Sequence, residues 1–113
     1  MALHNGSSVS GNTASAGGGV ANLGTLTLNS SSISGNTAET NGGGVSNFGT
    51  LTLNNGSTIS GNTAMNGGGI YNLGAVTLNG KSSTAGNFST YDIYNDGGTL
   101  QAGKLATTGN VGP

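Results

Sequence analysis

The side chains that could carry out acid–base chemistry are few and far apart in this sequence. Its carboxylates are Glu39, Asp92 and Asp96, and its one histidine, His4, lies near the N-terminus. Acid–base cleavage of a glycosidic bond needs clustered carboxyl groups. Only Asp92 and Asp96 are close in sequence, so we predict no catalytic residues and no enzymatic activity.

A cation site meets the same shortage of ligands. The segment 95–100, Asn-Asp-Gly-Gly-Thr-Leu, resembles a glycine–aspartate calcium repeat, but it occurs once, and such sites draw carboxylates from successive turns. The chain has no cysteine and therefore neither thiolate ligands nor disulfides. We expect no metal and no cofactor.

The charge of the chain limits its partners. Lys81 and Lys104 are its only basic residues besides His4, and the formal net charge is −1. Two lysines cannot neutralise a run of phosphates, so we expect no nucleic-acid partner. No apolar run is long enough to span a bilayer, and residues 1–6 lack the features of a signal peptide. We therefore expect no membrane insertion.

The composition resembles that of a disordered linker without its charge. Of 113 residues 24 are glycine, and Gly, Asn, Thr and Ser together make up well over half of the chain, whereas 4% of residues are charged. Disordered segments normally combine few apolar residues with many charges. Another feature of the sequence must therefore allow this chain to fold.

The sequence contains an internal repeat that can order the chain. Three glycine triplets start 25 residues apart, at Gly17, Gly42 and Gly67, and each is followed by a segment of the type Asn-Leu-Gly-Thr-Leu-Thr-Leu. Self-similarity at a fixed period indicates a solenoid. The apolar residues alternate with polar ones at a period of two, as in strands, and each unit contains three such stretches.

The repeat predicts an all-β fold, a right-handed parallel β-helix with about 25 residues per coil and three short strands per coil. We expect four coils and part of a fifth in a single domain, regular over residues 1–80 and degenerate over 81–113. Stacking then forms five inward apolar rows and an alanine corner. These are Leu26/Leu51/Val76/Leu100, Leu28/Leu53/Leu78, Val9/Ile33/Ile59, Val20/Val45/Ile70/Ile93 and Leu23/Phe48/Leu73, with Ala14/Ala38/Ala64 at the corner.

Glycine and asparagine suit the corners because both tolerate positive φ. Stacked asparagines can also bond amide to amide along the axis. We expect two such ladders, Asn12/Asn36/Asn62/Asn87 and Asn22/Asn47/Asn72/Asn95.

The string Ile33-x-x-Asn36-x-Ala38 followed by Gly42-Gly43-Gly44-Val45 resembles the polymorphic outer-membrane-protein repeat. The resemblance extends from residue 1 to about 80, with Gly44 where the family often has Ala and Ile33 where it often has Phe. It implies a right-handed parallel β-helix from a large bacterial surface, autotransported or secreted protein. It implies an extracellular or cell-surface location and no catalytic activity.

The two ends of the repeat suggest a function. The first coil enters in register with no cap before it, whereas Lys81, Asp92, Asp96 and Lys104 gather after residue 80, in a coil that is either a degenerate cap or a junction. We predict a structural protein that stacks head-to-tail with itself, as an extracellular fibre or a rigid surface stalk; a fragment of a longer solenoid is the alternative. The expected interface is Met1, Leu3, His4 and Val9 on one side and Tyr94, Leu100, Lys104, Leu105 and Val111 on the other.

Two further functions stay open at this point. Outward threonines form a partial Thr-x-Thr array similar to an ice-binding face, interrupted at Ala75 and preceded by Ala2 in the first coil. The rows of Ser, Thr and Asn could also contact a glycan, as in an adhesin, although no ligand is indicated. The threonine face consists of Thr25, Thr27, Thr50, Thr52 and Thr77.

Overall fold

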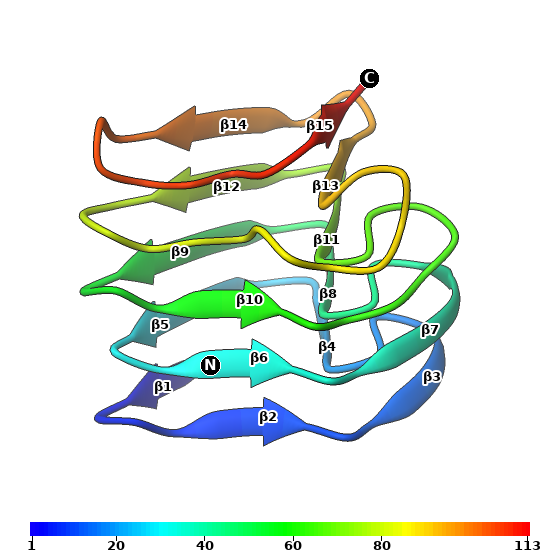
Figure 1. Ribbon diagram of the computed structural model, residues 1–113, viewed down its shortest axis with the longest axis horizontal. Coiled ribbons are helices and arrows are strands. Elements are labelled where there is room, and N and C mark those ends of the chain that lie inside the picture. Colours follow the sequence, from blue (N-terminus) through cyan, green and yellow to red (C-terminus); the bar gives the residue numbers. More distant parts are fainter.

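A computed structural model describes residues 1–113 as an all-β solenoid of about four turns (Figure 1). All strand pairs are parallel, and the chain rises from the first coil to the last in a right-handed sense. The principal extents are 29 × 27 × 25 Å. The predicted parallel β-helix is therefore confirmed.

The strands form four sheets, which we name A to D in chain order. Sheet A is β1-β5-β9-β12-β14, sheet B is β2-β6-β10, sheet C is β3-β7 and sheet D is β4-β8-β11-β13-β15. The strand bounds are β1 Ala2–His4, β2 Ser8–Ser10, β3 Thr13–Ala16, β4 Val20–Asn22, β5 Thr25–Asn29, β6 Ser32–Ser34, β7 Thr37–Asn41, β8 Val45–Asn47, β9 Thr50–Asn54, β10 Thr58–Ser60, β11 Ile70–Asn72, β12 Ala75–Leu78, β13 Ile93–Asn95, β14 Thr99–Ala102 and β15 Val111–Gly112.

The number of strands per coil varies along the axis. The expected three strands are found in the third coil, whereas the first two coils have a fourth, in sheet C. The additional strands, β3 and β7, cover Thr-Ala segments that were expected only to turn a corner. Their pairing is irregular, with a register shift between Ala14 and Ala16.

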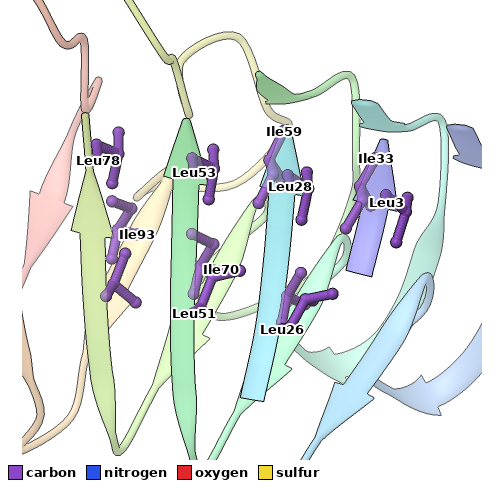
Figure 2. Packing of buried hydrophobic residues seen from close by; sticks show 12 residues of the cluster. Leu3, Leu26, Leu28, Ile33, Leu51, Leu53, Ile59, Ile70, Leu78 and Ile93 are labelled. Carbon is purple, nitrogen blue, oxygen red and sulfur yellow. The ribbon is translucent and has the colours of Figure 1, made fainter. Parts of the chain in front are cut away.

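Four of the five expected apolar rows form the core. Leu26 pairs with Leu51, Leu51 with Val76 and Val76 with Leu100, and the other three rows keep their expected partners. Figure 2 shows the buried members of these rows. Nearly all the interior members are fully buried. A core only a few side chains wide therefore extends through the stack.

The fifth row was wrong. Leu23, Phe48 and Leu73 are 80%, 55% and 39% exposed, so they lie outside the solenoid. Each follows a buried asparagine at the corner between sheets D and A. Because that asparagine occupies the inward position, the next side chain points out.

The corner between sheets C and D has no room for side chains. A Cβ on Gly43 would collide with the carbonyl oxygens of Gly68 and Thr63. The neighbouring Gly42 has φ of 65°, in the region that favours glycine. The glycine triplets are thus required by both close packing and backbone conformation.

The coils shorten toward the C-terminus. The path from sheet B to sheet D runs from Thr58 to Ile70 in the third coil, but only from Thr107 to Val111 in the last. Above Phe88, which bridges Thr63, sheet C has no further member. The last coil therefore continues sheets A, B and D only.

Candidate assembly surfaces

The N-terminal end presents one unpaired edge on every sheet. Each of β1, β2, β3 and β4 is the outermost member of its sheet. Leu3 is buried over Leu28, Val9 and Val20 are half-buried, and Met1, opposite Leu26 by register, is 65% exposed. The inward rows therefore reach this end without a covering element.

The C-terminal end presents three of these four rows. Leu100 is half-buried, Ala102 is exposed above Leu78, and Val111 is 42% exposed above Ile93. These residues occupy the last positions of rows that begin in the first coil. Both ends thus expose apolar members of one continuous core.

The other predicted interface residues lie at different places. His4 is exposed at the end of β1, where its Nδ1 is 3.2 Å from Asn29 Nδ2. Lys104 and the 66% exposed Leu105 lie in the turn after β14, on the corresponding corner of the last coil. Tyr94 lies on the outer face of sheet D, below β15, and does not reach the end of the stack.

Both expected asparagine ladders are confirmed. In the first, Nδ2 of Asn12, Asn36 and Asn62 donates to Oδ1 of the next asparagine at 3.1, 3.0 and 3.0 Å. In the second, the steps from Asn22 through Asn47 and Asn72 to Asn95 are 2.8, 2.9 and 2.9 Å. Every amide donates toward the C-terminal end, and the interior members are buried. A buried amide without partners would be costly, so the ladders also fix the register between coils.

At its C-terminal side each ladder ends on an acceptor that is not an asparagine. Asp92, 8% exposed, accepts from Asn87 N and Nδ2 at 2.7 and 3.1 Å through Oδ1, and from Asn110 N at 3.0 Å through Oδ2. Asn110 follows Gly109 as Asn62 follows Gly61 in the ladder, but its side chain is exposed. The second ladder ends where Asn95 Nδ2 donates to Gly98 O at 3.0 Å.

Sequence reasoning missed the role of Asp92. The available signal is its position directly before Ile93, where the two preceding coils have Gly44 and Gly69 before their row residue. A carboxylate in that place accepts hydrogen bonds but donates none. It can therefore end an amide ladder but cannot extend it.

A tyrosine cluster covers the upper part of sheet D. The Tyr71 and Tyr94 rings stack with centroids 5.4 Å apart and planes at 15°, and Tyr91 meets Tyr94 edge-on at 6.0 Å. The Tyr71 hydroxyl donates to Asp96 Oδ2. This hydrogen bond, with burial and the charge of Asp96, raises the pKa of Tyr71 to about 12.

The structure does not bring the acidic groups together as an acid–base pair. Asp92 lies in the asparagine ladder, Asp96 is held by Tyr71, and Glu39 and His4 are exposed on β7 and β1. No three His, Cys, Asp or Glu side chains gather in a group that could hold a metal ion.

The outward threonines are in register on sheet A. One row is Thr25, Thr50, Ala75 and Thr99; the next is Ala2, Thr27, Thr52, Thr77 and Gln101. Thr99, which the sequence reasoning did not include, restores the first row after Ala75. A third row, Asn29/Asn54/Asn79, extends the face, and Asn79 donates to Asn54 Oδ1 at 2.8 Å.

No protein-family model, curated protein or solved structure matches this chain. The resemblance to polymorphic outer-membrane-protein repeats thus stays a prediction. The structure contains no helix with the length and apolar character needed to cross a membrane.

Proposed function

We propose that this chain is a structural protein whose subunits stack head-to-tail along the solenoid axis. One observation carries the proposal: three inward apolar rows are open at both ends of the stack. They end in Met1, Leu3 and Val20 at one side and in Leu100, Ala102 and Val111 at the other. The row of Val9 is apolar at the first end only, because Thr84 follows Ile59 in it.

The register specifies how two copies would meet. Continuing each row would place Met1 over Leu100, Leu3 over Ala102 and Val20 over Val111. The large Leu3 would then lie over a small alanine, so the row has room for it. Sheets A, B and D would continue across the junction, whereas sheet C would be interrupted.

Stacking would also give hydrogen-bond partners to the backbone groups at the open strand edges. An unpaired strand edge offers free N–H and C=O groups to another chain. A contact between two different ends is heterologous and does not close on itself, so it produces a filament. An extracellular fibre or a rigid segment of a surface stalk, in a bacterial host, are the settings that we propose for such a filament.

A charge at the open end tests this proposal. We expect Leu3→Asp to abolish filaments seen by electron microscopy of the purified chain, because it places a carboxylate on the apolar junction. The matched control is Ala2→Asp, whose side chain points outward from the same strand. Filaments in the control and none in Leu3→Asp support the proposal; unchanged filaments in Leu3→Asp, or none from the unmodified chain, contradict it.

Ice binding is the second candidate, and the unbroken register of sheet A favours it. Its outer face holds threonines from four successive coils in two rows, with six members in all: Thr25, Thr27, Thr50, Thr52, Thr77 and Thr99. We expect thermal hysteresis from soluble protein if this face binds ice. Thr52→Tyr, in the middle of the face, would remove it, whereas Ser34→Tyr on the outer side of sheet B would not. No hysteresis in the unmodified protein rules this function out.

A further inference from the structure

The outward apolar row at the corner between sheets D and A lies outside the hydrophobic core. We name Leu23, Phe48 and Leu73 the corner ridge; they are 80%, 55% and 39% exposed. The preceding asparagines at this corner, Asn22, Asn47 and Asn72, are buried and carry the second ladder. The asparagine therefore supplies the buried contact at this corner, and the apolar residue after it faces outward.

The ridge is a continuous stripe along the axis. Its members lie in three successive coils, because the residues on either side of each member pair in parallel register. The row ends in the fourth coil, where Asp96 takes the position of Leu73. Within these three coils the stripe contains no charged side chain, and along a filament Asp96 separates the stripe of one subunit from that of the next.

The exposed threonines Thr25 and Thr50 follow the ridge on sheet A, two residues after Leu23 and Phe48. They give the stripe a polar margin. An apolar centre with a polar rim is the general pattern of a protein interface.

The area of the ridge decides what kind of partner it can hold. A large apolar side chain offers roughly 150–250 Å², so the three exposed fractions amount to about 350 Å² per subunit. A stable pair of proteins buries about 800 Å² on each partner. One ridge against one ridge is too small, whereas ridges repeated along a filament add up.

We infer that the corner ridge joins two filaments of this chain side by side, so that the occupant of the stripe is the same stripe on a second filament. This inference rests on the proposed head-to-tail stacking. Axial stacking places every ridge on the same corner of the filament. When two such filaments pair, many weak ridge contacts form together, and their combined affinity exceeds that of a single contact. Lateral pairing therefore follows axial assembly and does not occur between single subunits.

The test replaces the ridge by threonine in the triple variant Leu23→Thr, Phe48→Thr, Leu73→Thr. Electron microscopy should show paired filaments for the unmodified chain and single filaments for the variant. Material pelleted at low speed should fall roughly tenfold or more in the variant, because the repeated contact is lost. The matched control is Met65→Thr with Phe88→Thr, which removes two other apolar side chains, 73% and 65% exposed, from another side of the subunit.

The outcomes separate this inference from the proposed function. Single filaments from the unmodified chain, or paired filaments from the ridge variant, overturn lateral pairing and leave axial stacking in place. Equal loss of pairing in the control also overturns it, because the effect would then belong to exposed apolar surface in general. No filaments from any chain overturns axial stacking and lateral pairing together, and a circular dichroism spectrum unchanged by the substitutions confirms that each variant is folded.

Discussion

Residues 1–80 and 81–113 derive from the same repeat, yet they are held together differently. In the first region Asn36 and Asn62 are fully buried links of a ladder, and Leu and Ile fill the rows. In the second region Asp92 ends the ladder, Thr84 takes the place of an isoleucine in its row, and sheet C ends. Thr84 is fully buried and compensates by donating to Thr108 O at 2.8 Å. Repeated packing thus holds the first region together, whereas in the second region the rows of Ile93 and Leu100 are supplemented by individual polar contacts.

The largest expected difference is between two glycines, Gly43 in the first region and Gly103 in the second. Gly43→Ala should cost about 4 kcal/mol or more, or prevent folding, because the new methyl group meets backbone atoms that cannot move aside. In the second region, Gly103→Ala should stay within about 0.5 kcal/mol, since its Cβ would lie 3.7 Å from Leu78 O. Urea unfolding measures both, with Gly24→Ala, whose Cβ would meet open space, as control. Equal losses at Gly43 and Gly103 would contradict the contrast.

The next difference concerns asparagine. Asn62→Ala should cost about 2–4 kcal/mol, because it removes the oxygen that accepts from Asn36 N and Nδ2 and the amide that donates to the Ile33 and Ser60 carbonyls. Asn110→Ala removes the same side chain from an exposed position and should cost less than about 0.5 kcal/mol. Thermal unfolding followed by circular dichroism compares the two. A tolerated Asn62→Ala would show that the ladder does not hold the coils together.

The end of the ladder gives a smaller effect. Asp92→Asn puts an NH2 group near either Asn87 N or Asn110 N, both of which are donors. One buried hydrogen bond is then lost, at a cost of about 1–2 kcal/mol. Urea unfolding should show this loss without a change in the denaturant slope. A variant as stable as the unmodified protein would mean that an amide can end the ladder as well as a carboxylate.

The smallest effect is at the tyrosine cluster and depends on pH. The folded-state pKa of Tyr71, about 12, lies above its ordinary value, so the bond to Asp96 stabilises the fold below about pH 10. That stabilisation is lost as the pH rises toward 12. Absorbance at alkaline pH should show a late ionisation from Tyr71, and Asp96→Asn should lower the pKa of Tyr71 toward its ordinary value. Identical titration curves for the two proteins would contradict this assignment.

The fold of residues 1–80 is the more predictable from sequence, because a 25-residue period places similar residues of successive coils in register. Leu26 and Leu51 pair as expected, and so do Asn47 and Asn72. Periodicity does not specify whether a side chain at a corner points inward or outward. The sequence pattern therefore predicts Leu23 inside the solenoid, whereas its neighbour Asn22 occupies the inward position. The period marks Asp92 as an exception before Ile93 but does not give its partners, because Asn87 and Asn110 lie in two coils and are brought together only by the shortened chain path.

Fibre diffraction from concentrated protein tests axial stacking most directly. If subunits stack with their rows in register, the pattern should show a meridional reflection at about 4.8 Å and, from the five strands of sheet A per subunit, an axial repeat of about 24 Å. Particles that stay at the size of a single subunit at every concentration, and give no oriented pattern, would contradict the account.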